Sequence, residues 1–502
     1  MNAGAARFSR AHTLQSARWF LLGKVASALA TLAWLAWVTR SLMPQGGFDS
    51  YVAAMAYLET AIVLSLLGLD WLLIRHVPPC VSAGDGLGLR RLLRHALLAR
   101  LLCAAGFGAV ALLMASYFNL PPVLQAIHPG LLMALLLSEA LLRLLRDSAL
   151  ESMAAQGYTQ LGVLGRTLLC LAGAGLWVGS GRAVDVNTVL ALELGASLLM
   201  LICVAFWSRR VVSQVGDGAQ AVAPPLRQAW KACWHNYQSA LINYPMQPQA
   251  LVLMVSWFAT SAVLEAFGLV MRLFELLRNY VPGLLLMNVL RPRLIGRYAA
   301  EGDFPKVAAE ALWISRWSAI SVAPVVGVLL LYGDSLMRLV AGHAPEGAHW
   351  ALAALFATAL LRVHRQIGQV LVNCVGAPHL LTRMALVALL AWPLGVLLAL
   401  AGWPIWGAVL ALALDDLLWV LLTSFWMRRA GWLWPNGLGF MLGLLALAGL
   451  GALAVGQLSL LSGATGMVLG SMLIVLVTLA PLALLGKLPI RSLVQVLRGS
   501  GK

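Results

Sequence analysis

The sequence predicts an all-α, polytopic membrane protein with about 14 transmembrane helices. They are expected to form two pseudo-symmetric six-helix lobes around a central cavity, plus two extra C-terminal helices. Three observations predict this. Of the 502 residues, 61% are hydrophobic and 11% are charged, whereas a soluble protein carries roughly 25% charged residues. Apolar runs of membrane-spanning length recur along the chain, and its two halves share charged motifs.

The predicted spans are runs of about 20 apolar residues, the length that crosses the hydrocarbon core of a bilayer. They begin near Trp19, Ala53, Leu93, Leu131, Leu161, Thr188, Ser239, Val263, Ala309, Trp350, Met384, Ile405, Leu438 and Met467. The six cysteines have neither CxxC spacing nor the spacing of metal ligands. The sequence therefore predicts no disulfide framework, no metal site and no cofactor.

The net charge of +16 is distributed in a way that indicates membrane topology rather than nucleic-acid binding. If the N-terminus faces the cytoplasm, the predicted outside loops hold only Arg40, Arg182 and Arg338, and the inside segments hold the remaining loop arginines and lysines. Short cytoplasmic loops are enriched in these two residue types. We therefore expect a multi-pass protein of the plasma membrane with both termini in the cytoplasm and some attraction to anionic lipids.

A linker divides the predicted helices into two groups. The stretch RRVVSQVGDGAQAVAPPLRQAWK, residues 209–231, is polar and rich in Gly, Ala and Pro, which is the composition of a linker. It separates an N-lobe of six helices, 1–208, from a C-lobe of six helices, 232–430. Residues 431–502 would form helices 13 and 14 and a cytoplasmic tail.

The two lobes carry a repeated pattern. Glu59 in MAYLE corresponds to Glu275 in MRLFE, and the motif Leu-Leu-Arg-x-x-Arg begins at residue 141 and again at residue 360. Both matches have nearly the same offset along the chain. Six helices and a return to the cytoplasm give the two copies the same orientation. Such a parallel repeat indicates two bundles related by an axis along the membrane normal.

The tenth predicted helix carries a polar stripe. Arg362, Arg365, Gln366, Gln369 and Asn373 lie at i, i+3, i+4, i+7 and i+11, which places them on one helix face. A charge at the membrane centre costs about 2.5–3.5 kcal/mol on insertion scales. The stripe therefore predicts a polar cavity beside the helix, with snorkelling of the arginines to the membrane surface as the alternative.

Two other helices have intramembrane arginines. Arg143 and Arg146 lie in helix 4 among acids spaced three and four residues away, so pairing along the helix is the alternative to a cavity role. Arg272, Glu275 and Arg278 lie in helix 8 near the middle of the apolar run. A self-neutralised ion pair is the alternative interpretation there.

Helices 7 and 1 add polar candidates. Asn243 and Tyr244 lie beside Pro245 and Pro248, in a helix that could hydrogen-bond sugar hydroxyls or flex as a gate. A polar contact between helices is the alternative. Lys24 lies one to two turns inside the membrane, where it could face the cavity or snorkel.

Acidic residues within the spans are candidates for carrying a coupling ion, and the sequence does not choose among them. They are Glu59, Asp70, Glu193, Glu275, Asp415 and Asp416. The arginines favour an anionic ligand, because a guanidinium stays charged and pairs with phosphate through two hydrogen bonds. Amides and aromatic residues beside them suit a sugar attached to that phosphate, which indicates a lipid-linked phosphosugar.

Three stretches resemble polysaccharide transporter flippases of the multidrug/oligosaccharidyl-lipid/polysaccharide exporter superfamily. SLMPQGGFDSYVAAMAYLETAIVLSLLGLDWLLIR resembles their helix 1–2 region. AVLEAFGLVMRLFELLRNYVPGLLLMNVLRPRLIGRYAAEGDF resembles helix 8 and the loop that follows it. NCVGAPHLLTRMALVALLAWPLGVLLALAGWPIWGAVLALAL resembles the helix 10–12 region. The resemblance covers most of residues 15–430.

The resemblance implies two six-helix lobes around a cavity that opens alternately to each membrane face. It implies flipping of undecaprenyl-diphosphate-linked oligosaccharide repeat units across the bacterial inner membrane, driven by ion antiport, for surface polysaccharide or exopolysaccharide synthesis. Arg272, Arg278, Arg362 and Arg365 would contact the diphosphate or the sugars, and Lys24 would join them. The implied partners are the polyprenyl-diphosphate-linked glycan, membrane lipids, a glycan polymerase and export machinery, without nucleic acid.

Other functions remain open. The extra helices within 431–502 resemble the lipid II flippase branch of the same superfamily, which also contains multidrug antiporters. A membrane-embedded glycan polymerase or ligase is a third possibility. Such enzymes display a large outside loop with catalytic polar residues, whereas the longest predicted outside loop here is only residues 333–349. A transporter without enzymatic activity is therefore the preferred prediction.

Overall fold

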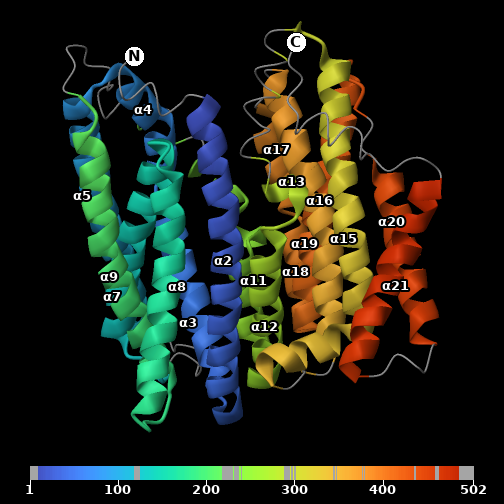
Figure 1. Cartoon of the computed structure of the whole chain (residues 1–502), viewed down its shortest axis with the longest axis horizontal. Helices are drawn as coiled ribbons and strands as arrows, with labels where there is room; N and C mark the ends of the chain where they lie inside the picture. Colours follow the sequence, from blue (N-terminus) through green and yellow to red (C-terminus); the bar gives the residue numbers. More distant parts are fainter. Residues whose placement is uncertain are drawn as a thin grey trace. The chain divides into compact units, whose positions relative to one another are not determined.

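The structure is a computed structural model of the chain, and it describes most of the sequence. The described residues are 10–117, 125–216, 230, 234, 237–238, 240–285, 287, 294, 298, 301–342, 345, 347–375, 377, 379–434, 437–457 and 463–484. Within these ranges the elements are helices, so the prediction of an all-α membrane protein is confirmed (Figure 1). The chain divides into two compact units, Met1–Glu265 and Ala266–Lys502.

The helices of the first unit are α2 (Arg10–Leu42), η1 (Met43–Gln45), α3 (Phe48–Leu64), α4 (Leu69–Ala83), α5 (Gly86–Tyr117), α7 (Pro129–Arg143), η2 (Leu144–Leu150), α8 (Gln156–Gly179), α9 (Val186–Ser213), η3 (Tyr244–Met246) and α11 (Pro248–Phe258). The helix α12 (Ser261–Arg278) begins in the first unit and continues in the second. The second unit contains α13 (Pro282–Leu285), α15 (Phe304–Ala341), α16 (Ala348–Cys374), α17 (His379–Ala388), α18 (Ala391–Leu400), α19 (Pro404–Arg429), α20 (Leu438–Gly456) and α21 (Gly463–Leu484).

Many of these helices have the length and composition of membrane spans. Eight are long and apolar enough to cross a bilayer, and a ninth span results if α3 and α4 count as one. Shorter apolar helices occur at Pro248–Phe258 and Thr465–Pro481. Each of the 14 apolar runs predicted from the sequence falls on a described helix or a consecutive set of helices. The chain is therefore a multi-pass membrane protein.

The second predicted span is broken. The axes of α3 and α4 differ in direction by 54°. Between them the backbone of Leu67 and Gly68 is left-handed, with φ values of 46° and 78°. Glycine adopts this conformation without strain, but leucine does not. The change of direction between α3 and α4 is therefore a sharp break at the left-handed residues Leu67 and Gly68, and it is not a gradual curvature of one helix.

The start of α3 is capped by α12. Gly47, the residue before α3, has no side chain that could cap the helix. Instead, the carboxylate of Glu265 accepts hydrogen bonds from the backbone amides of Phe48 and Asp49. Ser261 Oγ donates a hydrogen bond to the Asp49 carboxylate. A carboxylate at a helix N-terminus satisfies free amides and is favoured by the helix dipole, so these contacts attach the first turn of α12 to α3.

In the second unit, α15 and α19 are the helices against which the others pack. Helices α16, α20 and α21 pack against α15, and α16 and α18 pack against α19 (Figure 1). Gly327 of α15 lies so close to α20 that a Cβ atom would be 2.9 Å from the carbonyl oxygen of Ala448. A Cβ atom on Gly407 of α19 would lie 2.5 Å from the carbonyl oxygen of Gly395 in α18. Glycine therefore permits both close approaches.

The predicted lobe boundaries stay a prediction. The linker expected at 209–231 lies mostly outside the described residues, although α9 continues to Ser213. The division between the two units falls after Glu265. Helix α11, which the sequence assigned to the C-lobe of 232–430, packs against α3 of the first unit.

Candidate functional site

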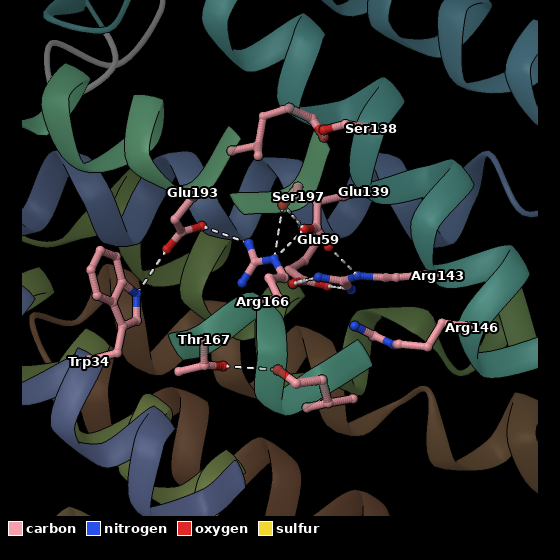
Figure 2. A network of polar contacts seen from close by, with 12 residues as sticks. Trp34, Glu59, Ser138, Glu139, Arg143, Arg146, Arg166, Thr167, Glu193 and Ser197 are labelled. Carbon is pink, nitrogen blue, oxygen red and sulfur yellow. Dashed lines mark hydrogen bonds and ion pairs between the residues drawn. The ribbon is translucent and has the colours of Figure 1, made fainter. Parts of the chain in front are cut away.

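The first unit contains a buried group of charged residues, which we call the first charge cluster. Its members come from four helices. They are Glu59 of α3, Glu139 and Arg143 of α7, Arg166 of α8 and Glu193 of α9. Figure 2 shows the two guanidinium groups directed toward the surrounding carboxylates.

Arg143 connects two carboxylates. Its Nη1 and Nη2 atoms each lie 2.6 Å from a carboxylate oxygen of Glu59, which is the bidentate geometry that arginine favours. Its Nε atom lies 2.9 Å from Oε2 of Glu139, four residues earlier on the same helix. The spacing of acids and bases in this helix allowed such pairing. The sequence did not reveal the longer-range contact with Glu59.

Arg166 connects the other two helices to the same cluster. Its Nε atom lies 2.6 Å from Oε1 of Glu139 and 2.9 Å from Oγ of Ser197. Its Nη2 atom lies 3.2 Å from Oε2 of Glu193. Glu139 and Glu193 are each 2% exposed. Arg166 therefore compensates the negative charge of both carboxylates. Replacing it with a neutral residue would leave the buried Glu193 without its ion-pair partner.

Glu193 also receives neutral hydrogen bonds from two further helices. Trp34 Nε1 of α2 donates to its Oε1 atom at 3.2 Å, and Tyr51 OH of α3 donates to the same oxygen at 2.7 Å. The first charge cluster therefore joins α2, α3, α7, α8 and α9. Two of the predicted ion-coupling acids, Glu59 and Glu193, belong to it.

The other predicted residues of this region lie outside the cluster. Arg146 pairs with its neighbour Asp147, with Nε–Oδ1 and Nη2–Oδ2 distances of 2.6 and 2.8 Å, and it lies beside the cluster, within electrostatic reach of Glu139 (Figure 2). Lys24 of α2 lies within electrostatic reach of Glu151. Tyr244 donates a hydrogen bond of 2.5 Å to Thr60 Oγ1.

Arg100 of α5 is a buried charge that the sequence analysis missed. Its guanidinium is fully buried and contacts neutral oxygens at the end of α3 and on α7. Nη2 lies 2.8 Å from the carbonyl oxygen of Ile62, Nη1 lies 3.0 Å from Ser65 Oγ, and Nε lies 3.3 Å from the carbonyl oxygen of Ala140. Arg100 therefore binds acceptors at the end of α3, where the span breaks.

Asp70 follows the same break. It lies in the first turn of α4, and Arg100 is within electrostatic reach of it. Its Oδ1 atom is buried and has no hydrogen-bond partner. The prediction that Asp70 carries a coupling ion stays a prediction.

The second unit contains the second charge cluster, formed by Arg362 and Arg365 of α16 and by Asp415 and Asp416 of α19. Nε of Arg362 lies 3.1 Å from Oδ2 of Asp416. Nη1 of Arg365 lies 2.9 Å from Oδ1 of Asp416 and also donates to Asp415. The guanidinium of Arg365 lies 4.5 Å from the ring centre of Trp419, in cation–π geometry. Both aspartates are 1% exposed.

Residues that the sequence assigned to two different roles are thus in contact. The arginines were predicted to bind substrate and the aspartates to carry an ion, with no prediction that they meet. Helix α19 supplies two adjacent acids at the depth of the α16 arginines. The repeat in the sequence could not show this, because Arg143, the counterpart of Arg362, pairs with Glu59 of α3 and with Glu139 of its own helix.

The polar stripe of α16 divides into two faces. Arg365 is buried toward α19, whereas Arg362, Gln366 and Gln369 are half-buried and Asn373 is exposed. The intervening residues 363–365, 367–368 and 370–372 are buried. The polar side chains of α16 that are at least partly exposed are therefore Arg362, Gln366, Gln369 and Asn373.

Arg278 of α12 lies within electrostatic reach of the second charge cluster. Arg362, Asp416 and Glu275 all act on it electrostatically, and its guanidinium lies 5.7 Å from the ring centre of Phe274. Its Nη1 atom is buried and has no hydrogen-bond partner. Arg272 and Glu275 on the same helix are half-buried.

The remaining predicted residue, Asn243, lies next to Tyr244 in the first unit, at the start of η3. No group of His, Cys, Asp and Glu side chains in the described part of the chain has the arrangement of a metal site. What the two charge clusters can do chemically is exchange partners. A guanidinium can release a carboxylate and bind another anion in its place. A carboxylate can bind a proton or a cation.

Comparison with known proteins gives the fold. No protein-family model matches the chain, and neither does any curated protein. Among solved structures, the lipid II flippase MurJ in an inward closed conformation has 11% identity and a TM-score of 0.55, and the match covers 93% of this chain and 97% of MurJ.

Multidrug transporters of the MATE family are also similar. An inward-facing MATE transporter of the MOP superfamily has 14% identity and a TM-score of 0.60, over 80% of this chain and 94% of that one. A mutant of the Vibrio cholerae MATE transporter VcmN has 14% identity and a TM-score of 0.55, over 83% of this chain and 98% of that one. The chain therefore has the transporter fold that MurJ and the MATE proteins of the MOP superfamily share.

Proposed function

We propose that this chain is a flippase that moves undecaprenyl-diphosphate-linked oligosaccharide repeat units across the bacterial inner membrane. It would serve the synthesis of a surface polysaccharide or exopolysaccharide and would work by ion-coupled alternating access. The fold of MurJ and MATE transporters supports a role in transport. The choice of a diphosphate-bearing substrate comes from the second charge cluster.

The single observation that carries the proposal is the set of arginines around Asp416. Arg362 and Arg365 contact its carboxylate, and Arg278 lies nearby with a buried Nη1 atom that has no hydrogen-bond partner. Keeping arginines in a membrane-embedded unit is costly unless they pair with anions. A diphosphate presents the same kind of oxygens as a carboxylate and more of them.

The geometry suggests how the substrate would bind. The carboxylates of Asp415 and Asp416 hold Arg362 and Arg365. A diphosphate would compete with these carboxylates for the guanidinium groups. Release of the substrate then restores the pairing. The half-buried Gln366 and Gln369 on the same helix would hydrogen-bond sugar hydroxyls.

The test is complementation of a strain that lacks this gene. We expect the deletion to accumulate the glycan on its undecaprenyl carrier at the inner membrane face and to lose one surface polysaccharide. Variants Arg362→Ala and Arg365→Ala should fail to restore export although they reach the membrane. Arg428→Ala, at the exposed end of α19, is the matched control and should restore it. Full export by Arg362→Ala/Arg365→Ala would disprove the assignment.

A lipid II flippase is the second candidate, and one observation favours it. The match with MurJ covers 93% of this chain, compared with 80–83% for the MATE transporters described above. The same strain distinguishes the two. Loss of this gene would then block peptidoglycan synthesis and accumulate lipid II, and a surface polysaccharide would be unaffected at first.

A further inference from the structure

The guanidinium of Arg365 has partners of two kinds, at its edge and at its face. At the edge, Nη1 donates to Asp415 and lies 2.9 Å from Oδ1 of Asp416. At the face, the guanidinium carbon lies 4.5 Å from the ring centre of Trp419. Arg362 differs, because its contact within the described residues is through Nε to the Asp416 carboxylate at 3.1 Å. Only Arg365 of these two arginines therefore rests on an aromatic ring.

Close packing of α16 against α19 keeps the ring under Arg365. Gly368 lies one turn after Arg365 on α16, and Thr423 lies one turn after Trp419 on α19. A Cβ atom on Gly368 would be 2.9 Å from Cγ2 of Thr423, so glycine permits the close approach of the two helices. Trp419 is 1% exposed. Its ring therefore cannot turn away from Arg365 without opening the packed interior.

Trp419 acts on its surroundings through its ring and not through its N–H group. The Nε1 atom is buried and has no hydrogen-bond partner in the described part of the chain. A buried N–H group without a partner is unfavourable, so hydrogen bonding does not explain a tryptophan at this position. The indole ring has the strongest cation–π attraction among aromatic side chains, and this attraction increases where water is excluded. The charge above the ring therefore accounts for the residue type.

The ring and the carboxylates bind different parts of the guanidinium. Carboxylate and phosphate oxygens accept hydrogen bonds from the N–H groups at its edge. The face of the indole ring carries negative charge density, which attracts the flat face of the cation. A diphosphate competes with Asp415 and Asp416 for the edge but cannot replace the ring. Arg365 therefore keeps its place while its anionic partner changes.

We propose that Trp419 is a positioning residue for diphosphate binding, which holds Arg365 in place when the aspartates release it. This inference rests on the proposed function. Without the ring, the guanidinium would be free to follow its carboxylates, and the diphosphate would have to recruit it from there. Loss of the ring should therefore appear as a loss of affinity for a diphosphate.

The first test titrates the purified full-length protein in neutral detergent with farnesyl diphosphate, a short polyprenyl diphosphate. We expect Trp419→Leu to raise the Kd about tenfold, and Trp419→Phe to raise it about threefold because phenylalanine keeps a weaker ring face. Trp434→Leu is the matched control and should leave the Kd unchanged. Trp434 belongs to the same unit, is 2% exposed and also has an Nε1 atom without a partner.

An unchanged Kd in the Trp419 variants would overturn the proposal. If Trp419→Leu does not fold, Trp419→Phe decides alone, and a Kd equal to that of the unmodified protein is then the contrary result. An equal rise in Kd for Trp434→Leu would also overturn it, because any lost tryptophan of the interior would then have the same effect.

The second test needs no ligand and so separates this inference from the proposed function. In a double-mutant cycle, Trp419→Leu should lower the Tm more in the presence of Arg365 than in the Arg365→Met background. Equal losses would show that the ring does not hold the guanidinium, whatever the chain transports. If the cycle shows the coupling but the unmodified protein does not bind farnesyl diphosphate, the proposed function is wrong and the positioning role is wrong with it.

Discussion

At the scale of single residues, Arg100 shows how a buried charge can serve structure without a carboxylate in hydrogen-bond contact. Its donors satisfy the carbonyl oxygens of Ile62 and Ala140 and the hydroxyl of Ser65. The carbonyl of Ile62 lies at the end of α3, where the helix can no longer supply a donor. Tyr237 OH assists by donating to the carbonyl oxygen of Leu64 at 2.6 Å.

We expect Arg100→Met to lower the free energy of unfolding by about 3 kcal/mol, because buried acceptors lose their donors while the side-chain volume is nearly kept. The measurement is thermal unfolding of the purified protein in neutral detergent. Arg94→Met on the same helix is the control and should change the Tm little, since Arg94 is exposed. Equal Tm values for the two variants would show that Arg100 does not hold the break.

At the scale of elements, the free backbone amides at a helix start are satisfied either by a neighbouring side chain or by one that is distant in sequence. Asp185 caps α9 in the usual way, accepting hydrogen bonds from the backbone amide of Thr188 at 2.9 Å and from the Thr188 hydroxyl. The Thr188 hydroxyl, followed by the backbone amide, holds the pKa of Asp185 below its ordinary value. Helix α3 has no cap of its own and depends on Glu265.

The Asp185 cap predicts a dependence on pH. A carboxylate whose pKa is lowered by folding stabilises the protein above its unfolded pKa of about 3.9, and this contribution is lost as the pH falls through the folded pKa. Asp185→Asn keeps a capping oxygen and removes the charge. We expect the unmodified protein to have the higher Tm at pH 7 and the difference to shrink as the pH falls below about 3.9. A difference that is constant from pH 7 to pH 3 would contradict this.

Close helix packing makes a second prediction at this scale. Gly407→Ala should lower the free energy of unfolding by about 1–3 kcal/mol, because its Cβ atom would lie 2.5 Å from a backbone oxygen of α18. Gly449→Ala on α20 is the control, since a Cβ atom there meets nothing within 4 Å. Thermal unfolding of both variants distinguishes a packing effect from the general helix preference for alanine over glycine.

At the scale of the whole molecule, the distribution of Arg and Lys predicts topology. Ser180, after α8, and Ser213, at the end of α9, are both exposed and lie on opposite sides of the predicted membrane. In a cysteine-free background, Ser180→Cys should react with an impermeant maleimide in intact cells. Ser213→Cys should react only after lysis. The reverse pattern would invert the proposed orientation.

Much of the fold could be predicted because apolar run length and composition are local properties of the sequence. The charge clusters could be predicted only as lists of candidates. Arg143 and Arg362 stood out by their motif, but their partners Glu59 and Asp416 are distant in sequence, and pairing across helices depends on packing. Arg166 was missed although a lone arginine in an apolar helix was itself a signal.

The cap on α3 has a consequence for biosynthesis. The residues that complete its first turn, Ser261 and Glu265, are translated more than 200 positions after Asp49. A nascent chain that has emerged only as far as α9 therefore has a start of α3 whose amides still lack their carboxylate. The first unit can reach its final form only when the ribosome has passed Glu265, beyond the segment predicted to separate the halves. Pausing of translation before that point should leave an assembly intermediate that is sensitive to membrane proteases.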